Sequence, residues 1–319
     1  MSSLQQLVSD QLAHLQPQFD LSLAPLSYFK IGGPAEVFIE ADTREKIIEI
    51  VSFCHQHHTP FKILAGASNV IISSNGVVGI TVSLTNSDYQ IIEQKDQKTL
   101  ISVGSGFKTA LLVRKTIDDG LSGLEYYLGV PGKVGGAVYN NAHYNEHLIG
   151  EYVHRVEVIQ PDNQIAWLNQ DECGFRYDFS RFQQSKDVIL QIEFLLPHGN
   201  KDESLALVRE ATLHRAQTQP LGQPSSGCYF QNIPNTPQLR QQFPQFSERS
   251  EFPSAFLIDQ AGLKKTRVGG VEVSEKHAAF FVNTGNGTSD EVKQLASIVK
   301  QKVKDQFGIE LHEEVFFLE

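Results

Sequence analysis

The chain has 319 residues, 40% of them hydrophobic and 20% charged, and 27 Lys and Arg against 37 Asp and Glu give a net charge of −10. This composition excludes a disordered chain, and no apolar run approaches the roughly 18–20 residues of a membrane span. An acidic balance without a basic cluster also excludes a general nucleic-acid binder. The length predicts two or three domains.

The cysteines and the N-terminal segment indicate the compartment. Cys54, Cys173 and Cys228 are widely spaced and form no CxxC pattern, so we expect neither a disulfide framework nor a zinc site. The first 16 residues are polar and lack the basic and apolar stretches of a secretory signal. A reducing cytoplasm is the expected location.

The first third of the chain predicts a small α/β domain. Residues 43–58 have helical periodicity, with Asp42 or Thr43 as the N-cap. One face of this helix carries Ile47, Ile48, Val51 and Cys54. Short apolar strands are expected at 61–64 and 70–72, on either side of a GASN loop.

The middle third predicts strands, followed by a glycine-rich loop. Alternating, β-branched stretches indicate strands in GITVSL, YQIIEQ and TLISVG, a hairpin at 153–160 and 165–168, and a strand at 188–196. A helix is expected at 108–119, ended by Gly120. Six glycines between Gly120 and Gly136 are too many for a regular element.

The composition changes near residue 200, where we expect a domain boundary. A helix is predicted at about 203–219. The last helix starts at a capping box of Thr288 and Glu291 and ends at Gly308, and residues 309–318 are expected to form a terminal strand.

Two loops of small residues could hold a ligand. The first is Gly66–Ala67–Ser68–Asn69, for which an ordinary turn is the better interpretation from the residues alone. The second is 129–137, where a phosphate cradle and packing glycines are equally good interpretations. Neither a P-loop nor a Rossmann fingerprint is present, so a dinucleotide site would need another architecture.

Several motifs, in order along the chain, resemble the UDP-N-acetylenolpyruvoylglucosamine reductase (MurB) family. These are YFKIGGPAEVF, LAGASNVIIS, GLEYYLGVPGKVGGAVYNNA, PSSGCYFQN, FLIDQAGLK, GGVEVSEKHAAFFVN and GIELHEEV. The chain is short between Phe182 and Pro220, as in the family's shorter branch. Its departures from the family patterns also suggest a divergent member.

The resemblance implies an α+β fold. A two-part FAD-binding unit of the vanillyl-alcohol-oxidase (VAO/PCMH) type would comprise residues 1–78 and 79–200. A substrate-binding α+β domain would follow at 201–307, and 308–319 would form a strand returning to the flavin site.

The implied reaction is the NADPH-linked, FAD-dependent reduction of UDP-N-acetylglucosamine enolpyruvate in peptidoglycan precursor synthesis. The implied cofactor-binding residues lie in the two loops: Gly66, Ala67, Ser68, Asn69, Gly129, Pro131, Gly132, Val134, Gly135, Gly136 and Ala137. No metal, nucleic acid, membrane or protein partner is implied. The histidines at 55–58 follow a predicted helix without a completing ligand, which favours a solvated helix end over a metal site.

Two catalytic residues follow from the matched motifs. Cys228 stands where the family has its proton-donating Ser, and a thiol is a stronger acid than an alcohol. Without the motif, a buried structural cysteine would be the better interpretation. Glu314 matches the terminal Glu that stabilises the enol, with Glu313 as the competing residue and a solvated strand end as the alternative for both.

The third implied catalytic residue, an Arg that holds the substrate carboxylate, is replaced. An ungapped match of 173–182 to the family pattern places Asp178 at the Arg position. Arg176 and Arg181 flank it, and we favour Arg176. The implied substrate-binding residues are Asn232, Tyr177 and Gln231. Lys276 and His277 are further candidates, with a structural role for His277 equally good.

Two alternative functions are also compatible with the sequence. A flavin oxidase or dehydrogenase of the same scaffold would act on another substrate and would lack the third-domain motif around Cys228. A non-catalytic paralogue would bind flavin or a nucleotide sugar without turnover. The changes at 178 and 228 favour that paralogue, whereas Glu314 and both glycine loops argue against it.

Overall fold

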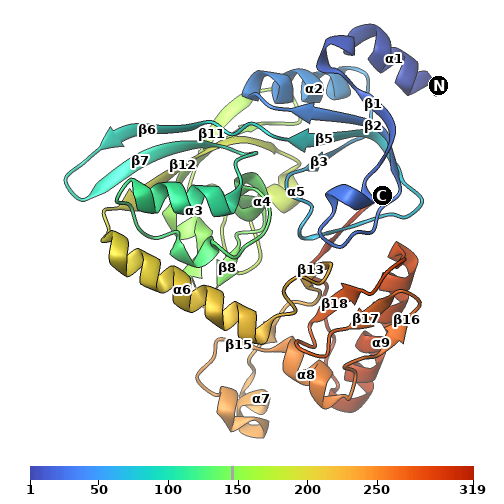
Figure 1. Ribbon diagram of the computed structural model, residues 1–319, viewed down its shortest axis with the longest axis vertical. Helices are drawn as coiled ribbons and strands as arrows, with labels where there is room; N and C mark the ends of the chain where they lie inside the picture. Colours follow the sequence, from blue (N-terminus) through green and yellow to red (C-terminus); the bar gives the residue numbers. More distant parts are fainter. Residues whose placement is uncertain (145–146) are drawn as a thin grey trace. The chain divides into compact units, whose positions relative to one another are not determined.

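The computed structural model describes residues 1–144 and 147–319 (Figure 1). These residues form two compact units. Unit 1 consists of residues 1–21, 34–67 and 77–215, and unit 2 of residues 22–33, 68–76 and 216–319. The domain bounds expected from the sequence stay predictions.

Unit 1 contains two sheets. The first has the order β1-β2-β5-β3, in which β2 and β3 both run parallel to β5. Its strands are β1 (Gln18–Ser22), β2 (Pro34–Ala41), β3 (Phe61–Leu64) and β5 (Val77–Leu84). Its core is shared with helices α1 (Ser3–Gln11) and α2 (Arg44–Gln56). The predicted helix at 43–58 is therefore confirmed, with Thr43 as its N-cap.

The second sheet of unit 1 is antiparallel, in the order β11-β10-β12-β7-β6. Its strands are β6 (Tyr89–Gln94), β7 (Lys98–Gly104), β10 (Val153–Ile159), β11 (Ile165–Asn169) and β12 (Val188–Pro197). Its apolar side packs on helices α3 (Thr109–Asp118) and α4 (Val134–Tyr139). All five of these strands lie where the alternating patterns predicted them.

Shorter elements complete unit 1. They are the helices α5 (Phe182–Ser185) and α6 (Lys201–Thr218), the hairpin β8 (His143–Tyr144) and β9 (His147–Leu148), and the 3-10 turns Ala13–Leu15, Glu125–Tyr127 and Ile149–Tyr152. The last three residues of α6 already belong to unit 2.

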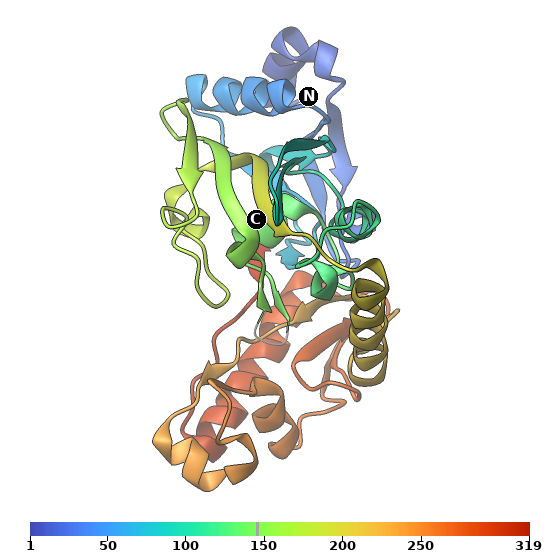
Figure 2. The same ribbon diagram turned by 90° about the vertical axis from the view of Figure 1, so that its left-hand side faces the viewer.

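Unit 2 is built on an antiparallel sheet of order β13-β18-β17-β16. The strands are β13 (Ser225–Cys228), β16 (Arg267–Val268), β17 (Val271–Val273) and β18 (Phe280–Asn283), and the helices are α7 (Pro237–Gln242), α8 (Ser254–Gln260) and α9 (Ser289–Phe307). Smaller elements are β14 (Ile233–Pro234), β15 (Glu251–Phe252) and the turns Ala24–Leu26 and Pro244–Phe246. Figure 2 shows α9 as the long red helix of this unit.

Helix α9 starts and ends as its sequence predicts. Thr288 and Glu291 form the capping box, and Gly308 ends the helix at φ 69°. The buried side of α9 carries Val292, Leu295, Ala296, Val299 and Val303, which join the core of unit 2. An apolar stripe with this spacing anchors a helix to a core.

The predicted terminal strand at 309–318 is wrong in extent. Only β19 (Phe316–Leu318) is a strand, and it pairs in parallel with β4 (Val70–Ile72). The preceding residues instead bond irregularly to 229–231, through a single bridge between Phe230 and Glu313. The chain leaves one partner segment for another here, so no continuous ladder can form.

Candidate active site

In unit 1, the two glycine loops contact each other main chain to main chain. A Cβ on Gly66 would lie 2.3 Å from the Cα of Gly132, a distance that no side chain tolerates. Gly132 also has a φ of 109°, a conformation that favours glycine. Ala67, in the first loop, is held at φ 50° in the left-handed region. Both loops are thus fixed in shape by backbone contacts.

The second loop is not irregular throughout, as the sequence had suggested. Helix α4 begins inside it at Val134 and includes Gly135 and Gly136. A Cβ on Gly135 would lie 2.8 Å from the Cβ of Ser105, and the Gly135 amide donates to the Ser105 carbonyl across 2.8 Å. The segment around Ser105 packs so close to position 135 that a larger side chain would clash there. Close packing therefore explains a glycine within this helix.

The two loops offer small residues to a cofactor diphosphate, while the amides of Val134 and Gly135 already donate to the carbonyls of Phe107 and Ser105. Small residues and close backbone leave no bulky side chain at the contact between Gly66 and Gly132. Lys133, the only cation in residues 129–137, directs its amine to the carbonyl of Leu84. Burial also lowers the pKa of Lys133. The observed arrangement therefore uses Lys133 to hold the loop.

In unit 2, Asn69 is bonded to the segment that carries Glu314. The side-chain amide of Asn69 donates to the Glu314 carbonyl across 3.1 Å, and the Asn69 carbonyl accepts from the Phe316 amide across 3.1 Å. Asn69, the last residue of the first loop, therefore holds the terminal segment of unit 2 through two hydrogen bonds.

Cys228 and Glu314 lie on adjacent chain segments of unit 2. Cys228 ends β13 after Gly227, whose φ is 85°, at a break in the pairing with β18. The residue after it, Tyr229, accepts a hydrogen bond from the Glu314 amide across 2.8 Å. The two predicted catalytic residues, 86 positions apart in the printed sequence, are thus brought together by main-chain bonding.

The other two cysteines are more deeply buried than Cys228. Cys54 and Cys173 are buried, whereas Cys228 is half-buried. Burial raises the thiol pKa of Cys54 and of Cys173 to about 12. Neither thiol is therefore available as a thiolate or as a useful acid near neutral pH.

Glu313, the competing residue, already has a cationic partner. Its two carboxylate oxygens each lie 2.9 Å from the amine of Lys300 on α9. Both carboxylate oxygens of Glu313 are therefore engaged by this one amine. Glu314 stays the predicted acid, with Glu313 as its competitor.

The segment containing Arg176 and Asp178 is held against the end of α4 in unit 1. Ser180 donates to the Tyr139 carbonyl across 2.6 Å, and Asn141 donates to the Arg176 carbonyl across 2.8 Å. The segment with Arg176 and Asp178 therefore lies beside α4, the short helix that begins in the second glycine loop (below, the glycine-loop helix).

The two flanking arginines differ in their contacts. Arg181 lies 3.7 Å from the Asp187 carboxylate. The exposed guanidinium of Arg176 lies over the Phe179 ring at 3.9 Å, and no acidic partner for it occurs within 1–144 and 147–319. Of the two arginines, Arg176 is therefore the one whose guanidinium is exposed and not held by a carboxylate within the described residues, and it stays the favoured candidate.

The remaining predicted residues have structural contacts. Asn232 accepts from the Ser254 amide at the start of α8 across 3.2 Å, and the Gln231 amide donates to the His312 carbonyl across 3.0 Å. Lys276 bonds the Ala216 carbonyl. Burial lowers the pKa of His277, which keeps this imidazole neutral.

The histidines at the end of α2 contact polar side chains from distant parts of the sequence. His55 contacts the Asn163 side chain and His57 the Gln11 side chain. Within the described ranges, no group of three His, Cys, Asp or Glu side chains is arranged to hold a metal. Nor does any helix there have the length and apolar character needed to cross a membrane.

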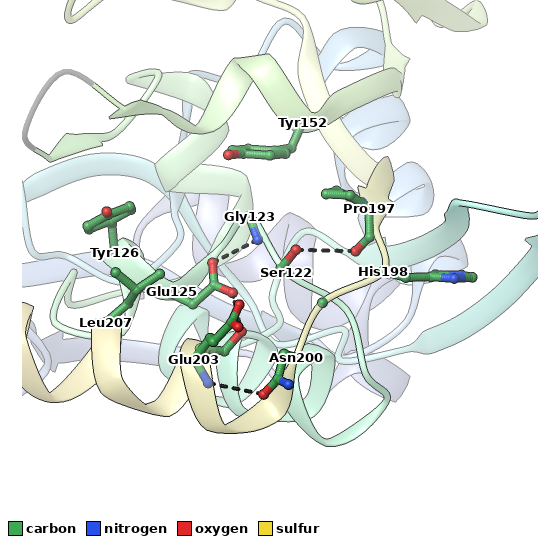
Figure 3. A pocket seen from close by; sticks show the side chains of 12 residues that line it. Ser122, Gly123, Glu125, Tyr126, Tyr152, Pro197, His198, Asn200, Glu203 and Leu207 are labelled. Carbon is green, nitrogen blue, oxygen red and sulfur yellow. Dashed lines mark hydrogen bonds between the residues drawn. The ribbon is translucent and has the colours of Figure 1, made fainter.

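Unit 1 also has a hollow of 630 Å³ between residues 122–126 and 197–207 (Figure 3). Its buried carboxylate, Glu125, accepts from the Gly123 amide at 2.7 Å and the Ser204 hydroxyl at 2.6 Å. Both oxygens of Glu125 are therefore engaged within the fold.

Sequence reasoning assigned no role to His143. In the structure its Nδ1 lies 3.0 Å from the Oδ1 of Asp178, 35 positions later in the chain. No local pattern connects these two residues, so only the fold could bring the pair to notice.

The comparisons with known proteins define a flavoprotein. Residues 35–169 match the model of an FAD binding domain, and residues 219–318 match that of the UDP-N-acetylenolpyruvoylglucosamine reductase C-terminal domain. A VAO-type flavoprotein from Myceliophthora thermophila shares the fold, with a TM-score of 0.50 at 8% identity over 85% of this chain and 70% of that one. The predicted fold class and FAD are thus confirmed.

Relatives of similar length identify the family. UDP-N-acetylenolpyruvoylglucosamine reductase from Chlamydia abortus is 36% identical over 91% of this chain and 90% of its own. The enzyme from Caldanaerobacter subterraneus is 32% identical over 90% and 88%. The crystal structure of the Thermus caldophilus enzyme matches with a TM-score of 0.76 and 27% identity over 94% and 98%. This chain belongs to the UDP-N-acetylenolpyruvoylglucosamine reductase family.

Proposed function

We propose that this chain reduces UDP-N-acetylglucosamine enolpyruvate to UDP-N-acetylmuramate, with NADPH as the reductant, in peptidoglycan precursor synthesis. The observation that carries the proposal is the match of both the FAD binding model and the reductase C-terminal model to one chain. The chemistry that FAD supplies when bound is hydride transfer from NADPH to the methylene carbon of the enolpyruvyl group. The residues that would hold it are those of the two glycine loops.

We assign the proton transfer to Cys228. Hydride addition to the methylene carbon leaves negative charge on the neighbouring carbon and its carboxylate, and a proton must then reach that carbon. The Cys228 thiol would supply this proton, and the resulting thiolate would recover a proton from solvent. Its half-buried position at the end of β13 is compatible with contact to both substrate and water.

Glu314 and Arg176 would stabilise the charge that develops. Glu314, in its neutral form, would share its proton with the enol, and Glu313, which is paired with Lys300, stays its competitor. Arg176 would bind the substrate carboxylate through its exposed guanidinium. Tyr177, Gln231 and Asn232 stay proposed substrate contacts, although Asn232 also supports α8.

The wider setting follows from this activity. A UDP-sugar substrate calls for no nucleic acid, membrane or protein partner, and we place the reaction in the cytoplasm. The division into residues 1–78 and 79–200 for FAD, 201–307 for the substrate and 308–319 as a returning segment is likewise proposed.

Steady-state NADPH oxidation tests this function. The purified protein is assayed with NADPH, with and without UDP-N-acetylglucosamine enolpyruvate, while dissolved oxygen is followed. We expect oxidation that depends on the enolpyruvyl substrate. Oxygen consumption with an alcohol substrate would instead indicate a flavin oxidase, and a yellow protein without turnover would indicate a binding paralogue.

A further inference from the structure

His143 and Asp178 form a contact that the assigned roles do not use. Nδ1 of His143 lies 3.0 Å from Oδ1 of Asp178, whose side chain is only 8% exposed, against 25% for His143. The other oxygen, Oδ2, is buried and has no hydrogen-bond partner in the described part of the chain. A buried carboxylate with an unused oxygen is costly unless a nearby cation or ligand compensates for it.

The imidazole is held on two sides. The Tyr177 ring lies 4.6 Å from the His143 ring, with an interplanar angle of 49°. Because Nδ1 faces Asp178, Nε2 is the nitrogen left to contact another group. With a proton on both nitrogens, Nε2–H becomes a hydrogen-bond donor on a positively charged ring.

The pair lies beside the glycine-loop helix. His143 is four residues after the end of α4, and the Asp178 segment is bonded to the Tyr139 carbonyl through Ser180. Asp178 is held at φ 50° in the left-handed region, an unusual conformation for a residue other than glycine. Surrounding contacts such as the bond from Gln183 to the Asp178 carbonyl, at 2.9 Å, fix this turn.

We propose that His143 binds the substrate carboxylate through Nε2–H, with Asp178 holding the imidazolium in place. This inference rests on the proposed function, which supplies a substrate with a carboxylate. A lone Asp178 carboxylate would repel that group, whereas a charged His143 neutralises Asp178 and presents a donor. Arg176 then adds net positive charge from the same turn as Asp178. His143 and Arg176 together would therefore replace the single Arg that the family pattern has at position 178.

Two substitutions separate the nitrogens of His143. His143→Asn keeps an amide donor near Nδ1, and so the contact with Asp178, but removes the group at Nε2. His143→Gln places its amide near Nε2. We expect KM for the enolpyruvyl substrate to rise at least tenfold in His143→Asn and severalfold less in His143→Gln. The rate of flavin reduction by NADPH alone should stay at the wild-type value in both.

Two further variants serve as control and rescue. His147→Ala, on the paired strand β9, removes an imidazole that stacks on Tyr126, and KM should change less than twofold. Asp178→Arg in a His143→Ala background should bring KM back toward the wild-type value, because it installs a guanidinium on the same turn.

The outcomes are distinct. If the wild-type protein shows no substrate-dependent NADPH oxidation, the proposed function fails, and this inference with it. If the wild-type protein turns over and His143→Asn has the same KM for the enolpyruvyl substrate as the wild type, this inference is wrong and the proposed function stands. An equal rise of KM in His143→Asn and His147→Ala would also overturn it, because hairpin disruption would then explain both.

Discussion

The side-chain amide of Asn69 donates a hydrogen bond to the main-chain carbonyl of Glu314 across 3.1 Å. The bond joins the loop after β3 to the segment before β19, 245 residues away. The Glu314 amide in turn bonds the carbonyl of Tyr229, next to Cys228. One short set of hydrogen bonds thus holds the two chain segments that carry Cys228 and Glu314.

Asn69→Ala should therefore impair turnover more than stability. The lost bond is worth about 1 kcal/mol, so we expect about a fivefold fall in kcat through misplacement of Glu314, with a small loss of thermal stability. Steady-state kinetics and thermal melting measure both effects. Asn75→Ala, at an exposed position nearby, serves as the control and should leave kcat unchanged. Equal kcat values for the two variants would contradict the positioning role.

Cys228 should be the cysteine that iodoacetamide modifies. The other two thiols are buried with pKa values raised to about 12, so they contain negligible thiolate at pH 8. We expect one label at Cys228, found by peptide mass spectrometry, together with loss of activity. Labelling of Cys54 or Cys173 at a similar rate would contradict the burial argument.

Replacement of Cys228 tests the proton-donor role itself. Cys228→Ala should lower kcat by about 10²- to 10⁴-fold, the usual contribution of a positioned general acid. Cys228→Ser should retain more activity, since a hydroxyl can still transfer a proton. Cys173→Ala, at a buried position outside the proposed site, provides the comparison for effects on folding. Activity near the wild-type level in Cys228→Ala would refute the assignment.

Glu314→Gln and Glu313→Gln form a matched pair of neighbouring substitutions. We expect kcat to fall about a hundredfold in Glu314→Gln, because the amide cannot share a proton with the enol. Glu313→Gln loses the partly exposed ion pair with Lys300, which is worth about 1 kcal/mol or less, and should keep its kcat. The reverse order of the two kcat values would move the acid to Glu313.

The contact between the glycine loops makes a prediction about FAD. Gly66→Ala would place a Cβ 2.3 Å from the Cα of Gly132, so the loops must separate and FAD affinity should fall at least tenfold. Gly136→Ala is the milder comparison, because its Cβ would lie 3.3 Å from the Cβ of Ala65. Flavin fluorescence during titration of the FAD-free protein measures both affinities. Equal affinity in the two variants would argue against a diphosphate at this contact.

The elements predicted best from sequence are those whose signals are local. The capping box of Thr288 and Glu291 and the left-handed Gly308 lie within α9 and its caps, so the helix bounds follow from the sequence. The short helix that begins at Val134 was missed, because its glycines signal an irregular loop. Glycine at position 135 reflects close packing, since a Cβ there would lie 2.8 Å from the Cβ of Ser105, and no local pattern reports a tertiary contact.

The candidate site shows the same limit. The matched motifs pointed to Cys228 and Glu314, but the bonds through Tyr229 and Asn69 that align them depend on chain segments distant in sequence. The contact between His143 and Asp178 was likewise unpredictable, because the two residues are 35 positions apart and no local pattern connects them. Pairs of this kind become visible only when the fold supplies the distance between them.

A single-turnover experiment tests the central claim most directly. The FAD-loaded protein is reduced with one equivalent of NADPH without oxygen, and UDP-N-acetylglucosamine enolpyruvate is then added while the flavin absorbance is followed. We predict prompt return of the oxidised flavin spectrum and one equivalent of UDP-N-acetylmuramate by mass spectrometry. A flavin that NADPH reduces but this substrate does not reoxidise would contradict the account.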